Sequence, residues 1–188
     1  MKFIDKKNIK LDKVPTLLDK FVVDFVKILQ KHANYVIVSG YVSILFGRSR
    51  ATEDIDILVE RMPKKRFYNF YSNLQKSGYW CVNTENKDEI LKILLDGLAV
   101  RLAKKSRIIP NVEFKFIKNA IEKNAIKTSI NVIMPSGKIK ISNIELQIAY
   151  KEKVLKSEKD LEDARHLEEI FKDEISNKLL GKYRKMLK

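Results

Sequence analysis

Cysteine and histidine are nearly absent from this sequence, which has one cysteine, Cys81, and two histidines, His32 and His166. A single cysteine excludes a disulfide within the chain and is typical of a reducing cytoplasm. Because no second histidine or cysteine stands at metal-ligand spacing, we do not expect a zinc site. Apolar runs stay well short of the ~18 residues of a membrane span, so we expect a cytoplasmic protein without a membrane partner.

Positive charge is in large excess, with a formal net charge of +14 over 188 residues. Such a field attracts polyanions, among them nucleic acids and nucleoside triphosphates (NTPs). The alternative is a lysine-rich surface that reflects the composition of the whole proteome. The charge is not accompanied by an RNA-recognition or helix-turn-helix signature, so it does not identify the partner.

Hydrophobic patterning predicts one domain with an α/β core, and the 45% of hydrophobic residues suffice for that core. We expect an N-terminal helical segment over about 1–32, the α/β core over 33–142 and C-terminal helices over 143–188. Helices are expected over about 15–31, 41–46, 63–76, 88–95, 143–155 and 158–171, and strands over 35–38, 54–59, 79–82, 98–102, 112–117, 128–134 and 138–141.

Two aspartates stand two residues apart on an expected strand, where their side chains share one face. Asp54 and Asp56 would then lie on that face, while Ile55 and Ile57 point into the core. Paired carboxylates repel each other unless a cation lies between them, and their oxygen atoms suit Mg²⁺ or Mn²⁺. The alternative is a solvated strand edge or an acidic helix cap.

An expected strand upstream ends at Ser39-Gly40, and a helix is expected to begin there. A strand-to-helix turn presents free backbone N–H groups, which makes it a candidate phosphate site. The alternative is an ordinary turn. Gly40 precedes Asp54 by 14 residues, a distance that suits a phosphate loop, a short helix and a return to the next strand.

These residues together resemble the nucleotidyltransferase signature, in which a Gly-Gly or Gly-Ser turn precedes an Arg-x-Thr-x-Asp-x-Asp segment. Here Val38-Ser39-Gly40 is followed by Arg50-Ala51-Thr52-Glu53-Asp54-Ile55-Asp56. Further along, Lys151 and the run from Lys159-Asp160 to Asp163 are similar to elements of the minimal and AbiEii-type nucleotidyltransferases. The resemblance covers about residues 33–170.

The resemblance implies the DNA-polymerase-beta-like fold, a small mixed sheet flanked by helices. It also implies transfer of a nucleoside monophosphate from an NTP to an unidentified acceptor, with two Mg²⁺ (or Mn²⁺) ions. The third metal-binding and catalytic carboxylate, beside Asp54 and Asp56, would be Glu113. Asp96, in an Asp-Gly turn, is the alternative.

Nucleotide-binding residues also follow from the resemblance. Ser39 and Gly40 would hold the β- and γ-phosphates, Arg50 (or Arg48) and Thr52 would line the approach, and Lys151 and Lys159 would contact the triphosphate. Tyr41 would restrict or stack on the nucleotide. The alternatives are surface salt bridges of the arginines with Glu53 or Glu60, solvated lysines, and an Asp163 that caps or pairs within its own helix.

Two departures from the signature keep other functions open. Ser39 replaces the first glycine of the turn, and Glu113 stands where the family more often has aspartate. Both favour a non-catalytic nucleotidyltransferase-fold module, for instance in a toxin–antitoxin-like pair, and the charge permits a basic nucleic-acid-binding protein. For an enzyme, the acceptor would be a protein hydroxyl, a tRNA end, an antibiotic or another small molecule.

Overall fold

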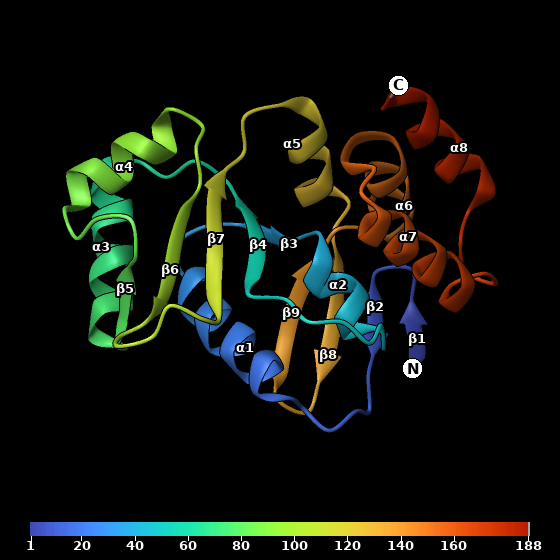
Figure 1. Cartoon of the computed structure of the whole chain (residues 1–188), viewed down its shortest axis with the longest axis horizontal. Coiled ribbons are helices and arrows are strands. Elements are labelled where there is room, and N and C mark those ends of the chain that lie inside the picture. Colours follow the sequence, from blue (N-terminus) through green and yellow to red (C-terminus); the bar gives the residue numbers. More distant parts are fainter. Residues whose placement is uncertain (188) are drawn as a thin grey trace.

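The computed structural model describes residues 1–187 and contains a nine-stranded mixed sheet flanked by helices (Figure 1). The strand order is β1-β2-β8-β9-β3-β4-β7-β6-β5. The strands are β1 Lys2–Asp5, β2 Asn8–Lys10, β3 Tyr35–Ile37, β4 Asp54–Val59, β5 Tyr79–Cys81, β6 Val100–Lys104, β7 Asn111–Phe116, β8 Ile130–Met134 and β9 Gly137–Ile141. The helices are α1 Leu17–Leu29, α2 Gly40–Leu45, α3 Lys64–Lys76, α4 Lys87–Leu95, α5 Ala120–Lys127, α6 Ile144–Tyr150, the π-helix Lys151–Leu155, α7 Glu158–Ile170 and α8 Asn177–Met186.

Strands β4 and β7 run parallel side by side and form the centre of the sheet together with β3. Burial alternates along β4 and, from Val112 onward, along β7, so each strand has one face in the core and one face turned away from it. The predicted alternation of β4, with Ile55 and Ile57 inward, is confirmed. In β7, Phe114 and Phe116 are likewise buried and face away from Glu113.

Aromatic side chains fill the layer beneath this inward face. Phe70 of α3 stacks on Phe114 of β7 and meets Phe25 of α1 edge to face. Phe67 of α3 contacts Phe116 in the same way. Helices α1 and α3 therefore cover the face of β7 opposite Glu113, and they leave the carboxylate face to α5 and the C-terminal helices.

The N-terminal segment was expected to be helical but begins with the two strands β1 and β2. Strand β2 joins the sheet beside β8, where Ile9 pairs with Val132 and is fully buried. These strands are only four and three residues long, too short for a periodicity signal. Helix α5 was likewise not predicted.

The C-terminal helices pack against α2 and α6 beside the sheet (Figure 1). The expected helix over 143–155 is divided in two, because α6 continues as the π-helix Lys151–Leu155. The π-helix ends at Lys156, which adopts a left-handed backbone conformation. A π-turn rotates the side chains that follow it, and such turns are frequent at functional sites. Within residues 1–187, no helix combines the length and the apolar character needed to cross a membrane.

Candidate active site

The three carboxylates that the sequence singled out lie on one face of the two central strands. Asp56 of β4 is the register partner of Glu113 of β7, and Asp54 precedes Asp56 by one pleat. All three side chains are half-buried on the face away from the aromatic layer. Asp96, the alternative third carboxylate, is exposed at the end of α4. The structure therefore places Glu113 beside the pair and Asp96 elsewhere.

The carboxylates perturb one another electrostatically. Burial, followed by repulsion from Glu113 and from Asp54, raises the pKa of Asp56 from its ordinary 3.8 to about 6. The hydroxyl of Ser39 and the ammonium group of Lys151 act in the opposite direction, but they only partly offset the increase. Uncompensated negative charge of this kind is what a bound cation would relieve.

The donor set fits Mg²⁺ or Mn²⁺ in its chemistry, because three carboxylates supply hard oxygen ligands. The three carboxylates lie farther apart in this structure than the ligands of a closed metal site. Among residues 1–187, no group of three or more acidic, histidine or cysteine side chains is gathered tightly enough to hold an ion. Binding of a metal ion at Asp54, Asp56 and Glu113 would therefore draw these side chains together.

The turn that precedes α2 has the backbone of a glycine turn although it begins with serine. Ser39 has φ 64° and ψ −138°, a conformation that residues with a side chain rarely adopt. Its backbone N–H donates to Oε1 of Gln147 at 3.2 Å. The next residue is glycine, and a Cβ on Gly40 would lie 2.6 Å from a guanidinium nitrogen of Arg50, so a larger residue there would displace the Arg50 side chain.

Arg50 belongs to a buried network of charges centred on Asp163. One carboxylate oxygen of Asp163 accepts from Arg50 at 2.6 Å and from Nζ of Lys151 at 2.9 Å. Lys151 also contacts Asp160 at 3.4 Å, and Arg48 approaches Asp163 at 3.6 Å and pairs with Glu162. Lys151 and Asp163 are fully buried.

This network corrects two of the alternatives raised from the sequence. The arginines do not form surface salt bridges with Glu53 or Glu60, and Asp163 does not pair within its own helix. Instead, Asp163 joins α7 to the π-helix and to the segment between α2 and β4. Because Arg50 covers Gly40 while it binds Asp163, the network fixes the position of the turn beside the carboxylates.

The other predicted nucleotide-binding residues have different surroundings. Thr52 donates its hydroxyl to the backbone oxygen of Asp54 at 3.0 Å and lies 3.3 Å from its carboxylate, so it orients that side chain. The side chain of Lys159 is exposed and makes no hydrogen bond or ion pair with any residue in 1–187. The expectation that Tyr41 stacks on a nucleotide is wrong: Tyr41 is buried and donates to Asp19 of α1 at 2.8 Å.

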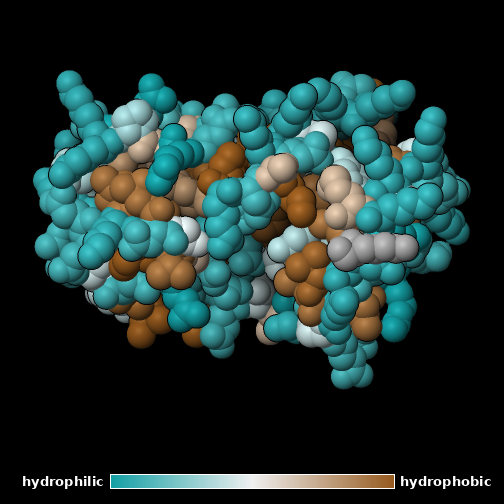
Figure 2. Space-filling model, turned by 90° about the horizontal axis from the view of Figure 1, so that it is seen from above, coloured by the Kyte–Doolittle hydropathy of each residue, from teal (hydrophilic) through white to brown (hydrophobic). Residues whose placement is uncertain are grey.

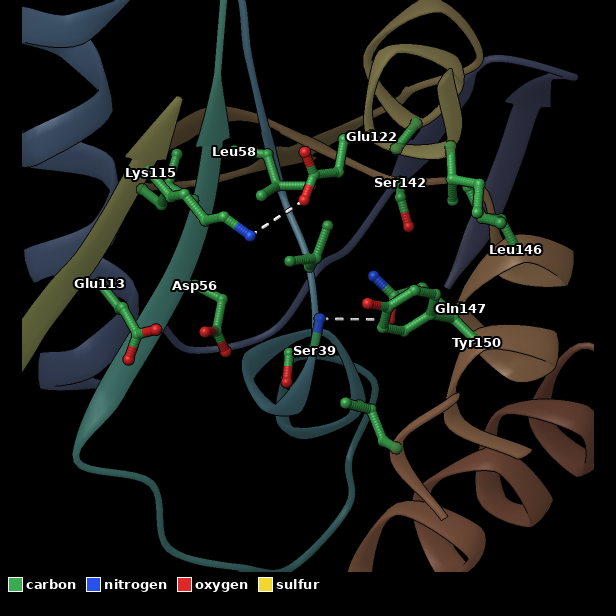
Figure 3. A pocket seen from close by; sticks show the side chains of 15 residues that line it. Ser39, Asp56, Leu58, Glu113, Lys115, Glu122, Ser142, Leu146, Gln147 and Tyr150 are labelled. Atoms are coloured by element: carbon green, nitrogen blue, oxygen red, sulfur yellow. Dashed lines mark hydrogen bonds and ion pairs between the residues drawn. The ribbon is translucent and has the colours of Figure 1, made fainter. Parts of the chain in front are cut away.

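A pocket of about 190 Å³ opens beside Asp56 and Glu113 on this face (Figure 3). Helix α5 forms one wall and α6 the other, and most of the surface exposed to the pocket is apolar. Its polar lining consists of Ser39, Asp56, Glu113, Lys115, Glu122, Ser142, Gln147 and Tyr150. Nothing in the sequence indicated the residues that α5 and α6 contribute, namely Glu122, Gln147 and Tyr150. The polar and apolar residues of α6 follow ordinary helical spacing, which does not indicate a pocket.

The two histidines do not take part in the site. His166 of α7 lies with Nε2 3.1 Å from the backbone oxygen of Phe46, at the end of α2, so it links two helices. His32 contacts Asn73 on the opposite layer.

Comparison with known proteins identifies the fold. Neither a protein-family model nor a curated protein sequence matches the chain. Among solved structures, the chain is similar to an antigenic nucleotidyltransferase-like protein from Paracoccidioides brasiliensis, with a TM-score of 0.57 and 18% identity over 89% of this chain and 86% of that one. It is also similar to the lincosamide antibiotic adenylyltransferase LnuA in its lincomycin-bound form, with a TM-score of 0.54 and 15% identity over 84% of this chain and 99% of that one. The predicted nucleotidyltransferase fold is therefore confirmed.

Proposed function

We propose that the protein transfers a nucleoside monophosphate from an NTP to an acceptor hydroxyl. The observation that carries this proposal is the placement of Asp54, Asp56 and Glu113 on one face of β4 and β7, beside the glycine-type turn at Ser39-Gly40. The fold shared with nucleotidyltransferases adds support.

The three carboxylates are assigned to metal binding. Two Mg²⁺ ions, when bound, would stabilise the attacking and the leaving oxygen of an in-line displacement. The carboxylate of Glu113 lines the pocket, so we assign it the proton of the acceptor hydroxyl. The acceptor oxygen forms a bond to the α-phosphorus, the bond from that phosphorus to the bridging oxygen breaks, and pyrophosphate leaves.

The surrounding residues hold this arrangement in place. Thr52 orients the carboxylate of Asp54 through its hydroxyl. Arg50 and Lys151, both held in position by Asp163, are assigned contacts with the triphosphate beside Ser39 and Gly40. The excess positive charge of the whole chain is assigned the attraction of the triphosphate to the site. Exposed Lys159 is assigned a weaker, long-range part in the same attraction.

A transfer assay tests this function. The protein is incubated with Mg²⁺ and each α-³²P-labelled NTP, with RNA, protein and small-molecule acceptors in separate reactions. We expect labelled product from wild type and a loss of at least 100-fold in Asp54→Asn and Asp56→Asn. Asp96→Asn, which removes an exposed carboxylate outside the site, is the matched control and should retain activity.

A second candidate is a non-catalytic module of the same fold, as in a toxin–antitoxin-like pair. It is favoured by Ser39, whose backbone N–H is already engaged by Gln147 and is thus removed from phosphate binding. On this reading, wild type and Asp56→Asn would give no labelled product with any acceptor. A third, basic nucleic-acid-binding role predicts RNA affinity that falls steeply with salt and is unchanged in Asp54→Asn.

A further inference from the structure

The pocket between α5 and α6 is large enough for one ring but not for a folded macromolecular surface. Its volume is about 190 Å³, and an apolar cavity of about 150 Å³ holds benzene. Val38, Leu58 and Ala125 are among its apolar lining residues, and Leu155 is one of its lining residues with substantial exposure. Viewed from above, the molecule has a hollow near its middle that is bordered in part by hydrophobic residues (Figure 2).

Beyond the proposed metal ligands Asp56 and Glu113, the charge of the lining offers nothing to a phosphate. The remaining carboxylate, that of Glu122, faces the one cation of the lining, Lys115. That cation is already paired, since Nζ of Lys115 lies 3.0 Å from Oε1 of Glu122 (Figure 3). A phosphate group entering the pocket would find no free positive partner there, and burying it unpaired would be costly.

The two cations assigned to the triphosphate lie outside the pocket. Arg50 lies over Gly40, and neither Arg50 nor Lys151 lines the cavity. Figure 3 shows α2 and the segment that follows it on the opposite side of Ser39 from Lys115 and Glu122. The triphosphate therefore belongs on the side of the turn, and the pocket lies beyond the carboxylates.

The chemistry of transfer then assigns an occupant to the pocket. In an in-line displacement, the attacking oxygen and the leaving pyrophosphate are on opposite sides of the α-phosphorus. With pyrophosphate on the side of Gly40 and Arg50, the attacking hydroxyl approaches from the side of Glu113, where the pocket opens.

Two polar side chains are placed to orient such a molecule. Gln147 is 4% exposed, and its amide end points into the cavity beside the ring of Tyr150 (Figure 3). Its oxygen accepts from Ser39, which leaves the NH₂ group available as a donor. Ser142 is 1% exposed, and its hydroxyl has only a long contact of 3.4 Å with a backbone oxygen.

We infer that this pocket is the acceptor site and that the acceptor is a small, uncharged ring compound bearing a hydroxyl group, rather than an RNA end. The inference rests on the proposed function. The hydroxyl oxygen bonds to the α-phosphorus, its proton passes to Glu113, and pyrophosphate departs with the electrons of the broken bond.

Ligand-observed NMR with benzyl alcohol and cyclohexanol as probes tests the pocket directly. We expect saturation-transfer signals with wild type and their loss in Ala125→Phe, which fills the cavity from α5. Ala120→Phe is the matched control, because Ala120 is exposed on the same helix. Ala125→Leu, a smaller filling, serves as a second variant if phenylalanine perturbs the fold, which thermal unfolding reports.

Competition distinguishes the possible occupants. A non-hydrolysable ATP analogue with Mg²⁺ should leave the probe signals in place. Displacement by the analogue would assign the pocket to the nucleobase, and displacement by an RNA ending in CCA would assign it to RNA; either result overturns the inference, as does the absence of probe binding. Calorimetry of the analogue with wild type checks the proposed function separately: missing nucleotide binding refutes that function, whereas missing probe binding alone refutes only the acceptor assignment.

Discussion

Asp163 provides a test of how the C-terminal helices are attached to the site. Replacement by asparagine keeps the shape of the side chain but removes a charge that Lys151 contacts at 2.9 Å and Arg50 at 2.6 Å. The side chain of Asp163 is 0% exposed and that of Lys151 is 1% exposed. Lys151 would thus remain buried with Asp160, at the longer distance of 3.4 Å, as its remaining anionic partner.

Breaking a buried pair in this way costs about 3–5 kcal/mol, because the remaining charge is left without compensation. Since Asp160 still offers Lys151 a partner at 3.4 Å, we expect Asp163→Asn to lower the free energy of unfolding by about 3 kcal/mol, the lower end of that range. A shift of this size is a large share of the stability of an ordinary domain.

Urea unfolding followed by circular dichroism measures the effect. Glu169→Gln is the matched control on the same helix, because the pair of Glu169 with Lys172 is exposed and should contribute less than about 1 kcal/mol. Lys151→Met combined with Asp163→Asn should cost about 2 kcal/mol less than the sum of the single changes. A loss in Asp163→Asn no greater than in Glu169→Gln, or strict additivity in the double variant, would refute the reasoning.

Two further predictions concern the carboxylates and the turn. The folded-state pKa of Asp56 is raised to about 6 from 3.8, so ionisation of this carboxyl opposes folding. The loss of folding free energy is absent below pH 3.8 and complete above pH 6. At about 1.4 kcal/mol per pH unit, it reaches about 3 kcal/mol. In urea unfolding with EDTA present, Asp56→Asn should therefore stabilise the protein by up to about 3 kcal/mol at pH 7.5 and by much less at pH 4. Equal destabilisation at both pH values would contradict this prediction. Ser39→Gly should raise the melting temperature measured by scanning calorimetry. It relieves about 1–3 kcal/mol of backbone strain, which is more than the roughly 0.4–1 kcal/mol that glycine costs by making the unfolded chain more flexible. A lower melting temperature would show that the serine hydroxyl contributes more than the strain costs.

Local patterns predicted how the proposed metal-binding carboxylates are oriented, because side chains along a strand point alternately to its two faces. Asp54 and Asp56 are two residues apart and therefore share a face, and the same alternation puts Glu113 and Phe114 on opposite faces. The pairing of Asp56 with Glu113 joins two strands that are 57 residues apart in sequence, and the resemblance to the nucleotidyltransferases suggested it, not the alternation alone.

Contacts between distant segments escaped sequence reasoning. The bond from Arg50 to Asp163 spans 113 residues, and that from Ser39 to Gln147 spans 108. Lysine and arginine are usually solvated, so no local pattern indicates that Lys151 is fully buried. The position of Tyr41 beside Gly40 suggests a contact with a ligand. In the structure its hydroxyl instead donates to Asp19 of α1, a contact between distant segments that no local pattern indicates.

The central claim is that Asp54, Asp56 and Glu113 bind the metal that serves nucleotide transfer. Crystals soaked with Mn²⁺ and a non-hydrolysable ATP analogue test it most directly, through the anomalous signal of manganese. The account predicts manganese between these three carboxylates, with the triphosphate beside Ser39 and Gly40. Manganese bound elsewhere, or the analogue bound with no manganese at Asp54 and Asp56, would contradict it.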